Sequence, residues 1–180
     1  MTGNARTPAR QAVERAIKRR LEREARSRWK RFLIVAGLLV LLDQAVKAVV
    51  RASLALGESR SPLSGVTIRR IDNEGIAFGL FPGRSTLIAV ITLVALGAIG
   101  VILSEIGRKH PAVPFGGGLL VGGSIGNVID RVMRGAVTDF VKMPGLDNYF
   151  NVADMGITGG ALLIAFGLWR TGEEPRPDIP

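Results

Sequence analysis

The chain has 180 residues, 47% of them hydrophobic and only 6% aromatic, with 23 glycines and a formal net charge of +9. The length suits one domain, but this apolar, glycine-rich composition is not typical of a soluble one. The absence of cysteine excludes disulfides, thiol nucleophiles and thiolate metal sites. A single histidine, His110, argues against a Ser-His-Asp triad or a histidine-rich zinc site. Any catalysis must therefore use carboxylates, amides, hydroxyls, lysine or arginine.

The N-terminal segment, residues 1–31, carries most of the positive charge. It contains 11 Lys and Arg against three Glu, a net charge of +8, which places it on the cytoplasmic side by the positive-inside rule. Apolar residues recur every fourth position and predict an amphipathic helix that would lie on an anionic inner leaflet. A solvated tail that only sets the topology fits the segment equally well, and the charge alone does not indicate nucleic-acid binding. The recurring apolar residues are Val13, Ile17, Leu21, Ala25 and Trp29.

Long apolar stretches follow, each close to the about 20 residues that cross a bilayer core of about 30 Å. They predict an all-α membrane protein, a bundle of four transmembrane helices. The stretches lie at about 32–50, 85–104, 112–129 and 153–169. With alternating spans, the basic link around Arg108, Lys109 and His110 and the tail, residues 170–180, are expected in the cytoplasm, and both longer links outside. The four-span domain is then residues 32–169.

The first outer link predicts a small extracytoplasmic β-sheet. "SPLSG" is a turn signal, and Val66 and Ile68 then alternate with polar neighbours as in a short strand. Ser85 follows a Pro82-Gly83 turn and is expected to cap the second span.

Glycines at four-residue spacing predict close helix packing in lipid. Gly118, Gly122 and Gly126 lie in the third span, and Gly156 and Gly160 in the fourth. Small residues at this spacing let neighbouring helices approach closely. We therefore expect the ends of these two spans to meet at the outer face.

Polar residues concentrate at that same end. The third span ends in the segment "GNVIDRVMRGAVTDF", and the fourth begins with the segment "YFNVADMG". Two carboxylates held close near lipid cannot both stay ionised, so they share a proton and provide a base and an acid, the chemistry of aspartic proteases. Asp154 is also a candidate helix cap, and Asp130 with Arg131 a structural ion pair. Spacing alone leaves open whether Asp130 or Asp139 partners Asp154.

The first span contains charged residues in the stretch "VLLDQAVKAVV". Asp43 and Lys47 lie four residues apart and are expected to form a helical ion pair in the outer half of the span, where Lys47 would also reach toward headgroups. This predicts a polar brace for the outer end of the bundle. Because acids within membrane helices also mark ion pathways, the alternative function is a small ion-coupled transporter, with its acids at a midplane cavity.

Four motifs, "DQAVK", "NEGIAFG", "GGSIGNVIDRVMRGAVTDF" and "FNVADMGI", follow one another over residues 32–169. In order and approximate spacing they resemble the lipoprotein signal peptidases, also called signal peptidase II or prolipoprotein signal peptidases. The resemblance implies a bacterial plasma-membrane aspartic peptidase with four spans, cytoplasmic termini and a small sheet on the outer surface. Such enzymes cleave diacylglyceryl-modified prolipoproteins just before the lipidated cysteine.

The resemblance also assigns residues. It places the catalytic pair on Asp139 and Asp154 and implies no metal or cofactor. The supporting positions that it implies are Asn73, Gly75, Asn127, Asp130, Arg131, Asn151, Asp43 and Lys47. The expected partners are lipidated prolipoproteins and membrane lipids, and one chain, a monomer, is sufficient for the site.

Overall fold

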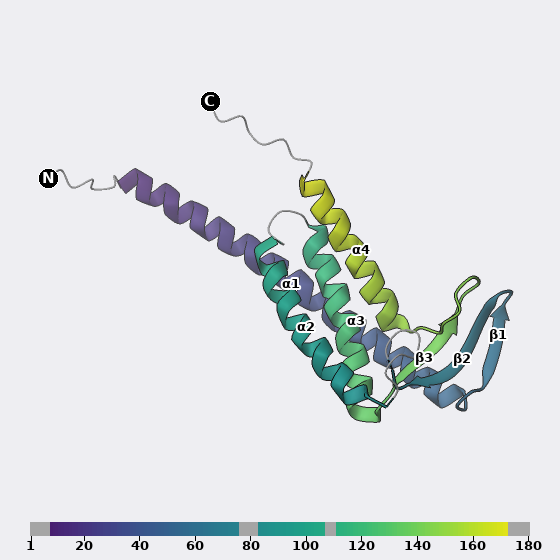
Figure 1. Cartoon of the computed structure of the whole chain (residues 1–180). Coiled ribbons are helices and arrows are strands. Elements are labelled where there is room, and N and C mark those ends of the chain that lie inside the picture. The colour runs from purple at the N-terminus through teal and green to yellow at the C-terminus, as the bar shows by residue number, and fades with distance from the viewer. Residues whose placement is uncertain (1–7, 76–82, 107–110, 173–180) are drawn as a thin grey trace.

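The computed structural model describes residues 8–75, 83–106 and 111–172 and consists of a helical bundle with a small sheet at one end (Figure 1). The sheet lies at the opposite end from the start of the first helix and the end of the last. The basic link at residues 108–110 falls outside the described residues, as does most of the predicted C-terminal tail. The helices are α1 (Pro8–Ser53), α2 (Ser85–Ile106), α3 (Ala112–Arg134) and α4 (Val152–Gly172), and the strands are β1 (Ser59–Leu63), β2 (Val66–Asn73) and β3 (Val137–Lys142).

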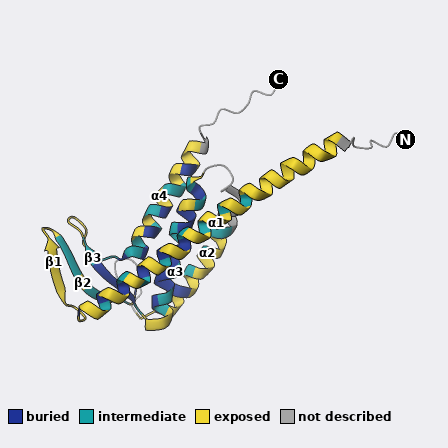
Figure 2. Ribbon diagram, turned by 180° about the vertical axis from the view of Figure 1, so that it is seen from behind, coloured by how far each residue is buried: buried dark blue, intermediate teal, exposed yellow. Residues whose placement is uncertain are grey.

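Helix α1 is a single helix of 46 residues that includes both the basic segment and the first apolar stretch. At 1.5 Å per residue it is about 69 Å long, more than twice a bilayer core of about 30 Å. Figure 2 shows its N-terminal half as an exposed arm beyond the bundle. The predicted division at residue 31 is therefore one of composition, with no break in the helix.

Three of the described helices, α1, α3 and α4, are long and apolar enough to cross a membrane. The described apolar stretch of α2, Ser85–Gly100, is shorter. The helical membrane architecture with a small sheet agrees with the sequence analysis, and the fourth crossing stays a prediction.

Close packing through glycine confirms the expectation from their spacing. A Cβ added at Gly122 would lie 2.7 Å from the Ala36 carbonyl oxygen of α1, and one at Gly116 would lie 2.7 Å from the Gly160 carbonyl oxygen of α4. Helix α3 thus packs against α1 with one face and against α4 with another, at distances that no larger residue allows.

The sheet is antiparallel, in the order β1-β2-β3. Strand β2 confirms the predicted strand, whereas "SPLSG" lies mostly in β1, with its turn completed at Gly65, whose φ of 80° favours glycine. Strand β3 was not predicted. The predicted cap at Ser85 is wrong: Ser85 is the first residue of α2, and among the described residues its Oγ has no hydrogen-bond partner.

Candidate active site

Asp139 lies in the middle of β3, where β2 supports it. Ile71 pairs with Asp139 across the two strands, and Asn73 pairs with Val137. Asn73 is thus a diagonal neighbour of Asp139 on the same face of the sheet. Its Nδ2 donates a hydrogen bond of 2.9 Å to Asp139 Oδ2. The strand pairing therefore fixes one side of this carboxylate.

The link after β3 folds back along the strand. Phe150 donates to and accepts from Val141, with N–O distances of 2.9 Å in both directions. The next residue, Asn151, is fully buried and donates from Nδ2 to Asp139 Oδ1 at 2.6 Å. The link therefore brings the start of α4 to the carboxylate.

Asp154 and Asn151 form a reciprocal cap at the start of α4. Asn151 Oδ1 accepts from the Asp154 main-chain N–H at 2.9 Å, and Asp154 Oδ2 accepts from the Asn151 N–H at 3.1 Å. This is the geometry of a capping box, in which Asn151 is the N-cap residue and Asp154, the candidate cap in the sequence, is its partner three residues later. Asn151 thus contacts both Asp139 and Asp154.

Asn127 of α3 holds the other oxygen of Asp154. Its Nδ2 donates to Asp154 Oδ1 at 2.8 Å. Its Oδ1 accepts from Lys47 Nζ at 2.9 Å and from Asn151 Nδ2 at 3.2 Å. Because Oδ1 receives two donors, the orientation of the amide is fixed, with its N–H groups toward Asp154.

Lys47 and Asp43 form the predicted ion pair, at 2.9 Å, and both side chains are fully buried. Lys47 does not reach toward headgroups as expected, because it also binds Asp130 at 3.2 Å and Asn127. Asp43 Oδ1 accepts from the Ala153 main-chain N–H at 2.9 Å. The predicted brace thus joins α1 to α3 and to the first turn of α4.

Asp130 and Arg131 do not form the predicted ion pair. Asp130 is fully buried and binds Lys47 and, at 3.1 Å, the main-chain N–H of Thr138. Arg131 instead donates to the Gly75 carbonyl oxygen at 2.9 Å. Consecutive residues on a helix point about 100° apart, so the two side chains serve different neighbours. Of the two candidate partners for Asp154, the fold brings Asp139 to it through Asn151, and Asp130 to Lys47.

A cavity of about 700 Å³ opens between the sheet and the bundle. Both Asp139 and Asp154 line it, together with the end of β2, Arg131 of α3 and the link after β3. Ile157 and Thr158 continue the lining one turn farther along α4. Within the described residues, no three His, Cys, Asp or Glu side chains are grouped so that they hold a metal ion. Asp139 and Asp154 thus face one common cavity.

Residues 35–170 match the family model described as signal peptidase (SPase) II. The chain is 39% identical over 150 residues to a lipoprotein signal peptidase of Syntrophomonas wolfei, an alignment that covers 82% of this chain and 97% of that one. A lipoprotein signal peptidase of Pelotomaculum thermopropionicum is 36% identical over 144 residues, covering 79% and 93%. The chain belongs to the signal peptidase II family. A solved bacterial membrane enzyme, determined by the in meso method at 2.3 Å resolution, superposes with a TM-score of 0.72 at 28% identity, covering 83% of this chain and 93% of that one.

Membership of the signal peptidase II family makes the chain an aspartic-type membrane peptidase and sets aside the transporter alternative. The structure agrees with this, because the acids of the candidate site gather where α3 and α4 meet the sheet. A transporter would require them at a midplane cavity.

Burial raises the pKa of Asp139 from 3.8 to about 6. Hydrogen bonds from Asn73 and Asn151 lower it, and the nearby negative charge of Asp154 raises it further. The side chain is only 4% exposed, so little water is available to stabilise its charge. Asp139 therefore retains its proton closer to neutral pH than an exposed aspartate does.

Three contacts around the candidate site were not predicted. Gln44 Nε2 donates to Asp43 Oδ2 and to the Gly126 carbonyl oxygen, both at 3.1 Å. Arg51 NH1 donates to Thr138 Oγ1 at 3.0 Å. Arg51 lies one turn beyond Lys47, so the four-residue spacing of 43, 47 and 51 was a usable signal. Thr138 offered none, because β3 itself was not predicted.

Proposed function

We propose that this protein removes the signal peptide from diacylglyceryl-modified prolipoproteins, cutting the bond just before the lipidated cysteine, with Asp139 and Asp154 as the catalytic pair. The observation that carries the proposal is that one buried residue, Asn151, hydrogen-bonds to both carboxylates. A shared donor keeps the two acids close enough to act on one water molecule. Lipoproteins are proposed as the substrate class because the relatives are lipoprotein signal peptidases. The diacylglyceryl modification of the substrate is what the family resemblance implies.

In the proposed mechanism Asp139 holds the proton of the resting pair and Asp154 acts as the base. Asp154 takes a proton from water, and the resulting hydroxide forms a bond to the carbonyl carbon that precedes the cysteine. Asp139 gives its proton to the cysteine nitrogen as the C–N bond breaks. The raised pKa of Asp139 supports this order, since a group with a pKa of about 6 is a better proton donor near neutral pH than an ordinary, fully ionised aspartate.

Polar groups in the cavity support a peptide as substrate. A peptide that enters from lipid needs partners for its N–H and C=O groups. Asn73 and Arg131 line the cavity beside Asp139 and offer amide and guanidinium groups. The diacylglyceryl chains would stay in the bilayer beside the bundle and orient the scissile bond.

The proposed topology has four spans, cytoplasmic termini and a catalytic pair near the extracytoplasmic face of the bacterial plasma membrane. The net charge of +8 on residues 1–31 supports the cytoplasmic N-terminus. The sheet, whose strand β3 contains Asp139, lies at the other end of the bundle from the start of α1, which supports an outer site. One chain holds both acids, which supports a monomeric enzyme.

The test is cleavage of a diacylglyceryl-prolipoprotein and of its unlipidated form by purified protein and by the Asp139→Asn and Asp154→Asn variants. We expect wild-type cleavage of the lipidated form only, and no cleavage by either variant. Asp147→Asn is the matched control, because Asp147 lines the same cavity but is exposed. Full activity of either catalytic variant, with a wild-type melting temperature, would exclude the proposed pair.

A further inference from the structure

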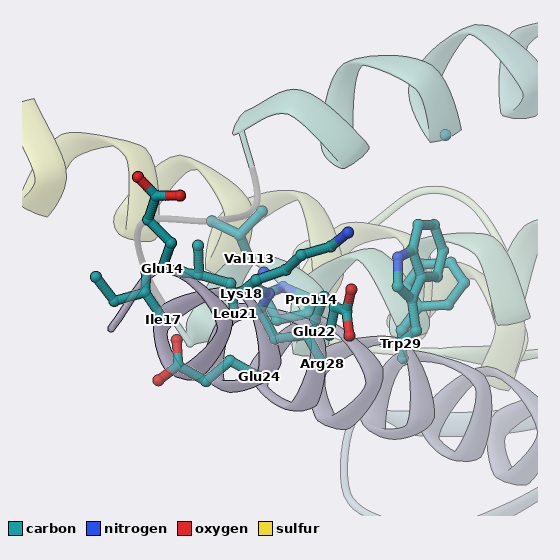
Figure 3. A pocket seen from close by; sticks show the side chains of 13 residues that line it. Glu14, Ile17, Lys18, Leu21, Glu22, Glu24, Arg28, Trp29, Val113 and Pro114 are labelled. Atoms are coloured by element: carbon teal, nitrogen blue, oxygen red, sulfur yellow. The ribbon is translucent and has the colours of Figure 1, made fainter. Parts of the chain in front are cut away.

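The N-terminal half of α1, residues 8–31, lies outside the part of the chain that matches the family model, and the catalytic site does not use it. A second groove of about 720 Å³ lies between this arm and the adjoining ends of α2 and α3. Figure 3 shows Val113 and Pro114 of α3 across from side chains of the arm. The arm thus carries a surface with no assigned role.

The side of the arm that lines the groove is apolar at its centre. Ile17, Leu21 and Trp29 line the groove, and they are 54%, 59% and 49% exposed. An exposed apolar stripe on a helix is stabilised when another apolar surface packs on it and removes it from water. In a protein that resides in a membrane, acyl chains provide this cover.

The opposite side of the arm is basic. Its cations follow one another at three- and four-residue spacing, which places them on one helix face. They are Arg15, Arg19, Arg23, Arg26 and Lys30, all exposed. A helix with an apolar stripe backed by arginine and lysine is the form that binds anionic membrane surfaces.

Charge complementarity selects the kind of lipid. Residues 8–31 contain ten Lys and Arg against three Glu, and one of these, Glu24, is already paired with Arg20 at 2.9 Å. Lys18 and Arg28 line the groove, but so do all three glutamates, so the excess of positive charge lies on the basic face and not in the groove itself. The excess of positive charge favours an anionic headgroup over a neutral one.

We propose that the arm is an anionic-phospholipid binding site, with acyl chains packed on the stripe of Ile17, Leu21 and Trp29 in the groove and headgroup phosphates bound by the basic face. Lipids bound in this way anchor the end of the bundle farther from the sheet at the membrane surface. This role is separate from catalysis, since the groove contains neither Asp139 nor Asp154.

The absence of cysteine provides a clean test, because a single introduced cysteine can be labelled without background. Bimane is attached to full-length Ile17→Cys protein and, as a matched control one residue away on another face, to Ala16→Cys protein. Each is reconstituted in nanodiscs of phosphatidylcholine, or of phosphatidylcholine mixed with phosphatidylglycerol, in which the acyl chains are brominated. Quenching by bromine reports contact with acyl chains, and quenching by iodide reports contact with water.

We expect bimane at position 17, but not at position 16, to be quenched by brominated chains, and more strongly with phosphatidylglycerol than without it. Raising the salt from 0.1 M to 1 M shortens the Debye length from about 10 Å to about 3 Å and should remove most of this excess. Each basic residue near an anionic surface strengthens binding about fivefold. A variant with Arg15, Arg19 and Arg23 all changed to Gln should therefore lose the dependence on phosphatidylglycerol.

Peptidase activity in detergent, unchanged by these three substitutions, verifies that the variant is folded. Equal quenching at positions 16 and 17, or no dependence on phosphatidylglycerol, would overturn the proposal. Shielding of position 17 from both bromine and iodide would overturn it too, because a second copy of the chain or another protein would then cover the stripe.

Discussion

Ionisation of the buried Asp139 carboxyl should lower the free energy of unfolding of the enzyme by a measurable amount. Its pKa lies at about 6 in the folded protein against an ordinary value of 3.8. Because one pKa unit corresponds to 1.36 kcal/mol, this rise corresponds to about 3 kcal/mol. The folded state binds the proton more tightly than the unfolded state, so this contribution is absent at low pH and destabilises the fold once Asp139 is ionised. Stability due to this group therefore falls as the pH rises from about 4 to about 6, and is constant above that.

The Asp139→Asn variant should lack this dependence, because an amide does not titrate. The free energy of unfolding of the variant minus that of wild type should then increase by about 2.5 kcal/mol between pH 4 and pH 8. For a chain of this size, that corresponds to a change of about 5–10 °C in the difference between the two melting temperatures. The difference reports Asp139 together with its electrostatic coupling to Asp154, since all other titrating groups are common to both proteins.

The assay is thermal unfolding of both proteins in one detergent across the pH series. Asp147→Asn serves as the control, because it removes a carboxylate that is exposed at the same cavity. Its curve should stay parallel to wild type. If the difference between Asp139→Asn and wild type is also independent of pH, then Asp139 is not held in a desolvated environment, and its assignment as the resting proton donor is wrong.

Three further substitutions test the surrounding network. Gly126→Ala places a Cβ 2.7 Å from Asp43 Oδ2 and should cost about 1–3 kcal/mol in thermal unfolding, whereas Gly159→Ala, with nothing within 4 Å, should not. Lys47→Met removes the cation paired with Asp43 and leaves Asp130 only Arg51 and Arg134, both at 3.7 Å, so it should cost about 3–5 kcal/mol, again measured by unfolding. Asn151→Ala removes a donor that lowers the pKa of Asp139, so the high-pH limb of the rate profile should move to higher pH and kcat should fall. An unmoved limb would show that Asn151 does not act through Asp139.

The helices and their contacts were predictable from the sequence because lipid imposes simple patterns. Apolar length identified α1, α3 and α4, and four-residue spacing identified both the glycine contacts and the ion pair of Asp43 with Lys47. Each of these signals is local to one helix. They required no knowledge of which segments meet.

Strand β3 shows where such signals end. Val137–Lys142 is buried over its first four residues and pairs with a strand more than 60 residues earlier in the chain. Its alternation is weak, because residues on both faces are covered. The partner of Asp130 was also not predictable from adjacency: Arg131 is next to it in the sequence, but its nearest cation, Lys47 at 3.2 Å, lies on another helix.

The structure also explains why charged side chains are buried in the bundle without contacting the proposed catalytic water. An asparagine amide has no preferred orientation unless its oxygen is held, and Asn127 Oδ1 is held by Lys47. Lys47 can be buried only because Asp43 and Asp130 neutralise it, and Asp43 in turn fixes the first turn of α4 through Ala153. The charges of the first span therefore act two contacts away from the chemistry, by orienting the amide that binds Asp154. This predicts that substitutions in the network reduce kcat through geometry, with the proton affinity of Asp139 changed less than by loss of Asn151, its direct donor.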